Sequence, residues 1–109
     1  MNIDRVDIEA STRNSLLRAR VLACLAVVGV AHAGELAELA RTDTTTLRRV
    51  MHGDPPAWSV ERAPVTLGLA VVVPHPSLEV YAITDAGRVW HAHQRLASRR
   101  ARVAAAALP

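Results

Sequence analysis

One segment limits the possible folds more than any other part of the chain: residues 34–53, with the sequence GELAELARTDTTTLRRVMHG. Apolar residues recur at helical spacing on both sides of Arg41-Thr42, which predicts two short helices joined by a tight turn. Asp43 is placed to cap the second helix, expected over residues 44–52 and closed by the final glycine of the segment. The residues expected to face inward are Leu36, Ala37, Leu39, Ala40, Leu47, Val50 and Met51.

A long apolar helix is expected ahead of this segment, from Ser11 to a stop at Gly29. Its broad apolar stripe places it at the centre of the core or partly in a dimer interface. That stripe consists of Leu16, Leu17, Val21, Leu22, Cys24, Leu25 and Val28. The polar residues 1–10 are expected to form a loose N-terminal arm or an extension of the helix. Residues 30–33 are long enough only for a stub of strand.

Residues 54–64 interrupt the helical pattern with an Asp-Pro-Pro sequence that forces a loop. Trp58 is expected to be an anchor on the surface of the domain. A further short helix is expected over residues 60–67, capped by Ser59 and ended by Gly68.

A β-hairpin and a long final helix follow. Apolar runs at residues 69–73 and 78–83 flank the sequence PHPS and predict two strands with a four-residue tip. Thr84 is placed to cap a helix that runs from Asp85 to about residue 105. The expected fold class is therefore mainly α with a small β-hairpin, an α+β fold.

The order of these elements resembles the winged helix-turn-helix superfamily of bacterial and archaeal transcriptional regulators, of the MarR, PadR and ArsR type. Residues 34–53 supply the helix-turn-helix half. The second half is similar to a family pattern in which Leu-Gly-Leu-Val enters the first wing strand and Tyr-x-Leu-Thr-x-x-Gly-Arg leaves the second. The matching residues here are Leu67, Gly68, Leu69, Tyr81, Ile83, Thr84, Gly87 and Arg88.

The resemblance implies a winged helix-turn-helix with a long C-terminal helix. It divides the chain into the arm or helix extension at residues 1–10, the domain at residues 11–98, and a basic, Ala-rich helix end or tail at residues 99–109. The chain departs from the family at the tight turn, where Arg41-Thr42 replaces a usual glycine and an apolar residue. The segment Asp54–Pro64 is an insertion relative to short family members.

The expected function is that of a sequence-specific double-stranded DNA-binding transcriptional regulator. A helix of this length fits the major groove, so residues 44–52 are expected to be the recognition helix. The wing, residues 69–83, is expected near the adjacent backbone or minor groove. The candidate DNA-binding residues are Arg41, Thr44, Thr45, Thr46, Arg48, Arg49, His52, His75 and Ser77. The alternative is a winged-helix protein–protein interaction module that does not read DNA.

Charge and composition bear on the partners. The formal net charge is +3, and the 13 basic residues are all arginine, the better bidentate partner for phosphate and guanine. Five of these arginines and no acid lie in residues 88–109, which leaves three readings of that segment: a solvated face, a dimerisation helix or an added DNA contact. We favour a homodimer through the terminal helices. Aromatic residues make up only 3%, which argues against stacking on single-stranded bases.

Catalysis, metals and cofactors are not expected. His91 and His93 are two residues apart on a helix and point in different directions, which makes a poor metal pair. No nucleophile motif or phosphate-cradling glycine loop appears. The apolar run before Ala31-His32-Ala33 mimics a signal peptide, but it is shorter than the roughly 20 residues that span a bilayer, and acids precede it. A cytoplasmic protein without membrane attachment is expected, and the sequence identifies no effector.

Overall fold

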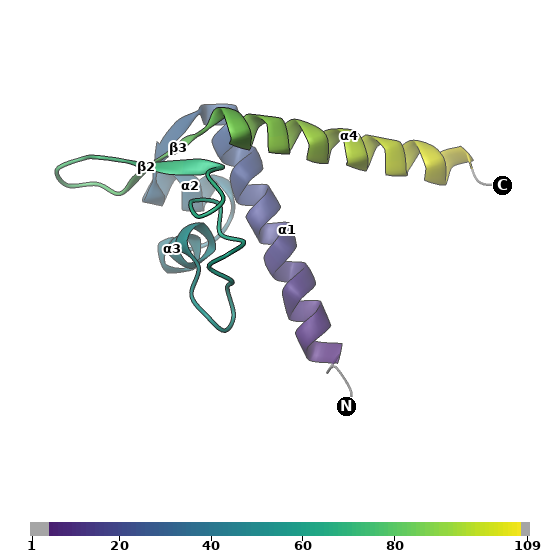
Figure 1. Ribbon diagram of the computed structural model, residues 1–109, viewed down its shortest axis with the longest axis horizontal. Coiled ribbons are helices and arrows are strands. Elements are labelled where there is room, and N and C mark those ends of the chain that lie inside the picture. Colours follow the sequence, from purple (N-terminus) through teal and green to yellow (C-terminus); the bar gives the residue numbers. More distant parts are fainter. Residues whose placement is uncertain (1–4, 108–109) are drawn as a thin grey trace.

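The computed structural model describes residues 5–107, with side chains from Thr12 onward, and these residues form four helices and a three-stranded sheet (Figure 1). The helices are α1 (Arg5–Val28), α2 (Ala33–Leu39), α3 (Thr44–His52) and α4 (Asp85–Ala107). The strands are β1 (Val30–His32), β2 (Ala70–Val73) and β3 (Val80–Ile83). The predicted class is confirmed: mainly α, with a small sheet and a long C-terminal helix, in an arrangement consistent with a winged helix.

The short helices and the sheet gather around the C-terminal half of α1, whereas the N-terminal half of α1 and the C-terminal half of α4 project as two diverging arms (Figure 1). α1 begins at Arg5, so residues 5–10 extend the helix; residues 1–4 lie outside the described part. The expected apolar stripe is only partly buried. Val21 and Leu25 are in the core and Leu17 packs against it, but the neighbouring Leu16 is 66% exposed.

The core forms where α1, α2 and α3 meet the sheet, and most of the predicted inward residues belong to it. Leu36, Ala37, Ala40, Leu47, Val50 and Met51 are all buried. The prediction for Leu39 is wrong, because this side chain is 50% exposed. Leu36, Ala37 and Ala40 already occupy the inner face of α2, and Leu39 lies on its flank.

The predicted helix over residues 60–67 is wrong: these residues form a series of turns. Pro64 has no N–H to donate along a helix, and its carbonyl instead accepts from Leu69 N at 2.9 Å. The turns are tied to α3, because Val65 N donates to Met51 O at 3.2 Å. Trp58 is an anchor, but a buried one: it is 6% exposed and belongs to the core rather than to the surface.

The sheet has the strand order β1-β3-β2, with both pairs antiparallel. The hairpin is confirmed, but its connection spans residues 74–79 rather than a four-residue tip. The cause is His75, whose Nδ1 accepts hydrogen bonds from Ser77 N at 3.1 Å and Leu78 N at 2.9 Å. These bonds curl the tip and keep Leu78 off the ladder. The three-residue stub β1 pairs with β3, opposing Ala31 to Tyr81.

The start of α4 is capped as predicted, because Thr84 Oγ1 accepts from Gly87 N at 3.0 Å. The same hydroxyl donates to Gly68 O at 2.6 Å and fastens the helix to the beginning of the wing. The helix continues to Ala107, two residues further than expected. None of the helices within residues 5–107 combines the length and apolar character that crossing a membrane requires.

Candidate nucleic-acid interface

α3 begins at a strong side-chain cap. Asp43 Oδ1 accepts from Thr46 N at 2.7 Å, and Asp43 Oδ2 accepts from the Thr46 hydroxyl at 2.8 Å. The backbone bond from Thr46, followed by its side-chain bond, holds the pKa of Asp43 below its usual value. The predicted cap is therefore present. It also occupies the Thr46 hydroxyl, which belongs to the cap rather than to the outer face of the helix.

Replacing Asp43 by alanine is expected to lower the melting temperature near neutral pH by on the order of 5 °C. The pKa of the cap is lower in the folded chain, so its stabilisation is complete above the unfolded value of 3.8 and is lost as the pH falls through the folded value. The difference in melting temperature between the alanine variant and the wild type should therefore become smaller at acidic pH. Thermal unfolding followed by circular dichroism measures it. Asp43→Asn, which keeps a capping oxygen, is the control, and an equal loss in both variants would contradict the capping role.

The two faces of α3 are clearly divided. Leu47, Val50 and Met51 are buried. On the opposite side Thr45, Arg48 and His52 are exposed, whereas Thr44 and Arg49 are half-buried. Of the five residues expected to face outward, the structure therefore shows three as exposed and two as half-buried.

Two carboxylates that the sequence did not single out hold the two arginines of α3. Arg48 Nε lies 2.5 Å from Oε2 of Glu79, the residue directly before β3. Arg49 Nε lies 2.8 Å from Asp54 Oδ2, in the insertion. Both arginine side chains remain partly open to solvent, 56% and 42% exposed respectively. The guanidinium groups are thus fixed over the outer face of α3 by short, charge-assisted hydrogen bonds.

Glu79 also belongs to a polar cluster that joins α3 to the wing. The Tyr81 hydroxyl donates to Glu79 Oε1, and His52 Nε2 lies 2.9 Å from that hydroxyl. Burial raises the pKa of Glu79, but the hydrogen bonds from Tyr81 and Arg48 outweigh it and hold the pKa below its usual value. Burial, and then the Glu79 carboxylate, raise the pKa of Tyr81. Glu79 therefore carries a negative charge directly beside Arg48.

The tight turn before α3 has a positive backbone angle at a residue other than glycine. Arg41 has φ 58, in the left-handed region that favours glycine. The turn is nevertheless closed, because Thr42 N donates to Ala37 O at 2.9 Å. The turn therefore closes in a left-handed conformation at Arg41, although this residue is not glycine. The Arg41 side chain is exposed next to the first turn of α3.

His75 and Ser77 are both exposed at the tip of the wing, which reaches away from the body of the domain (Figure 1). His75 has a structural part there, since its Nδ1 holds the tip through two backbone N–H groups. Residues 70–80 include no arginine or lysine. Phosphate contacts at the tip would therefore use side chains other than arginine and lysine, such as the Ser77 hydroxyl.

A family model matches residues 8–93, which run from α1 through the wing into the first turns of α4. The chain belongs to the EarA-like family. The EarA-like region includes α3, both carboxylates that hold its arginines, and the loop that carries Trp58. Neither a curated protein nor a solved structure matches the chain.

Proposed function

We propose that this chain is a sequence-specific, double-stranded DNA-binding transcriptional regulator of the winged helix-turn-helix superfamily, acting in the cytoplasm. In this proposal α3 enters the major groove, and the wing lies near the adjacent backbone or minor groove. The observation that carries it is the division of α3, a nine-residue helix with one face buried and Thr45, Arg48, Arg49 and His52 turned outward. A helix of this size, anchored by one face, leaves the other for base edges and phosphates.

The ion pairs of α3 fit this function as a resting arrangement. Glu79 and Asp54 limit the freedom of two long side chains, which lowers the entropy lost when those side chains bind. Each pair is exposed on one side, so a phosphate or the O6 and N7 atoms of guanine can take the place of the carboxylate. Arg48 and Arg49 are the proposed base readers, and Arg41, Thr44 and Thr45 the proposed contacts near the start of the helix.

The proposed homodimer is supported by the two projecting arms. On the α1 arm Leu16 is exposed, and on the α4 arm Leu96 and Val103 are exposed, the latter by 63%. Isolated helical arms gain little stability from their own hydrogen bonds in water, and pairing would bury these apolar side chains. Two copies of α3 would then be presented together, as a twofold binding site requires.

A protein–protein interaction module is the second candidate, and the same ion pairs favour it. Arg48 and Arg49 are matched by Glu79 and Asp54, so the face of α3 has less positive charge than its sequence implies. A face with paired charges of both signs suits a protein partner with a complementary pattern. The two functions differ in their dependence on salt and on duplex DNA.

Replacing Asp54 by asparagine separates the two candidates. The variant releases Arg49 and removes a negative charge beside the proposed phosphate path, so duplex affinity is expected to rise by roughly two- to fivefold. The measurement is fluorescence anisotropy of a labelled duplex across a salt series, in which log K should fall linearly with log salt for wild type and variant. Glu61→Gln, in the same loop and exposed, is the matched control and should leave affinity unchanged. Absence of salt-dependent binding to any duplex would contradict the proposal and favour the interaction module.

A further inference from the structure

We propose that a pocket between α1, the turns of residues 60–69 and α4 binds a small organic anion with a planar apolar body. The pocket has a volume of about 310 Å³, at the lower end of the range of roughly 300–1,000 Å³ for small-ligand sites. Arg18, Arg62, Ser15 and Gln94 supply its polar groups. We call it the Arg18 pocket. It lies away from α3 and plays no part in the proposed reading of DNA.

The charge in the Arg18 pocket is unbalanced. Burial and then the nearby positive charge of Arg62 lower the pKa of Arg18. Arg18 Nη2 donates to Ser15 Oγ at 3.4 Å, and no carboxylate is paired with Arg18 or Arg62 in the part of the chain that the structure describes. Arg48 and Arg49, by contrast, each have an acidic partner. An anion between Arg18 and Arg62 would relieve their repulsion and accept bonds from both guanidinium groups.

The rest of the lining is apolar and includes one aromatic ring. Leu22 and Leu69, which are both buried, line the pocket together with Trp90 of α4, which is half-buried. A planar ring attached to the anion can pack against these side chains, and apolar surface of this kind supplies most of the free energy of small-ligand binding. The ligand class is therefore an aryl or heteroaryl phosphate or carboxylate rather than a bare inorganic ion.

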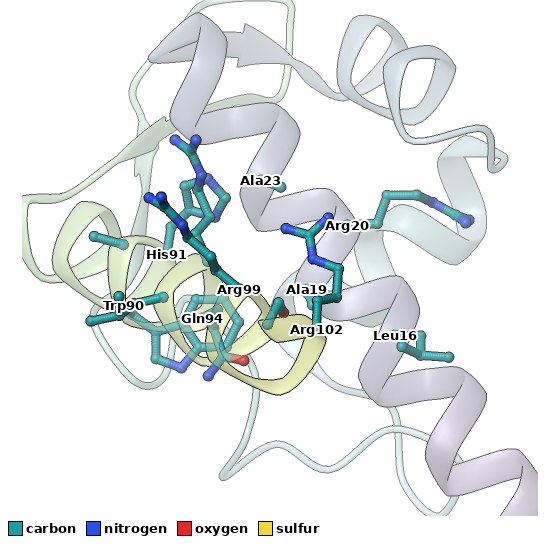
Figure 2. A pocket seen from close by; sticks show the side chains of 13 residues that line it. Leu16, Ala19, Arg20, Ala23, Trp90, His91, Gln94, Arg99 and Arg102 are labelled. Carbon is teal, nitrogen blue, oxygen red and sulfur yellow. The ribbon is translucent and has the colours of Figure 1, made fainter. Parts of the chain in front are cut away.

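A groove beside the Arg18 pocket adds to the positive charge around it. Figure 2 shows it between α1 and α4, where Arg99 and Arg102 lie between the two helices, whereas the Arg20 side chain points away from Trp90. Trp90 and Gln94 line both the groove and the Arg18 pocket. Neighbouring positive charge raises the local concentration of anions and their rate of association. The pocket thus opens beside a surface that attracts the proposed ligand.

Fluorine NMR of protein labelled with 5-fluorotryptophan tests the proposal. The chain has two tryptophans: Trp90 lines the pocket, and Trp58, 6% exposed in the core, serves as an internal reference. Phenyl phosphate, benzoate, inorganic phosphate and uncharged benzyl alcohol are titrated separately. We expect a saturable shift of the Trp90 signal with phenyl phosphate or benzoate, whose relative affinities show which anion is preferred. Inorganic phosphate and benzyl alcohol should each bind at least about tenfold more weakly.

Three variants complete the test. Arg18→Gln and Arg62→Gln should each weaken binding of the preferred anion about tenfold, with the Trp58 signal unchanged as a sign of an intact core. Arg13→Gln, an exposed residue of α1 outside the pocket, should bind like the wild type. The proposal is overturned if neither aryl anion gives a saturable Trp90 shift, or if Arg13→Gln weakens binding as much as the two pocket variants. No DNA is present, so either result leaves the proposed DNA-binding function to its own test.

Discussion

Replacing Arg48 and Arg49 together by alanine is expected to remove sequence-specific binding to duplex DNA. Each arginine, if bidentate to a guanine, contributes about 1–3 kcal/mol of discrimination, so affinity for a preferred duplex should fall by roughly 30-fold or more. The loss is increased because Glu79 and Asp54 would then face the phosphates without a cation. Fluorescence anisotropy with a labelled duplex at constant salt measures the change.

The matched control for this double variant is Arg99→Ala with Arg100→Ala, another adjacent pair of exposed arginines, on the α4 arm. It removes the same formal charge from a position distant from α3. We expect it to retain the preference for one duplex sequence over another. If both double variants lose affinity equally, or if the α3 variant loses none, α3 is not the reading element.

Replacing Gly87 by alanine is expected to be strongly destabilising, by about 3 kcal/mol or more. A Cβ atom at this position would lie 2.0 Å from Leu69 O and 2.6 Å from Ile83 Cδ1. The nearest of these atoms is backbone, so α4 and the first residue before β2 would have to separate. Because the Thr84 cap joins the same elements, the wing and α4 should loosen together. Urea unfolding with both fluorescence and circular dichroism measures the loss.

Gly68→Ala is the comparison for that variant. Gly68 has φ +73 but nothing within 4 Å of an added Cβ, so only backbone strain of about 1–2 kcal/mol is expected. The test is therefore which of the two variants loses more free energy of unfolding. A loss for Gly87→Ala no greater than that for Gly68→Ala would show that the close approach of α4 to Leu69 is not what limits this position.

Local features of the sequence were enough to predict α3 in detail. The cap at Asp43, the buried face of Leu47, Val50 and Met51, and the end at Gly53 all depend on residues within one or two helical turns of each other. The Thr84 cap of α4 was predictable for the same reason. Where a capping residue and the spacing of apolar residues indicate the same helix, the local sequence is enough to predict that helix.

The errors arise where neighbouring elements decide the outcome. Residues 60–67 have a helical pattern, but Pro64 and the bond from Val65 to Met51 O turn them into a covering for α3. The hairpin tip lengthens because the ring of His75 competes for the backbone of Ser77 and Leu78. A periodic pattern cannot show either of these contacts.

The acidic side chains that pair with Arg48 and Arg49 could not be predicted from the sequence. Arg48 and Glu79 are 31 residues apart, and their contact depends on where the residue before β3 lies relative to α3. One signal was available: Glu79 and Tyr81 are two apart, which places them on the same face of a strand. That spacing gives no position for α3, so it could not identify Arg48 as their partner.

Selection of duplexes from a random library tests the central claim most directly. After several rounds with the wild-type protein, we predict one recurring half-site, present as two inverted copies about 10 base pairs apart, centre to centre. The variant with both Arg48 and Arg49 replaced by alanine should not enrich that half-site. Selected sequences that do not differ from the starting library would contradict the claim that α3 reads DNA.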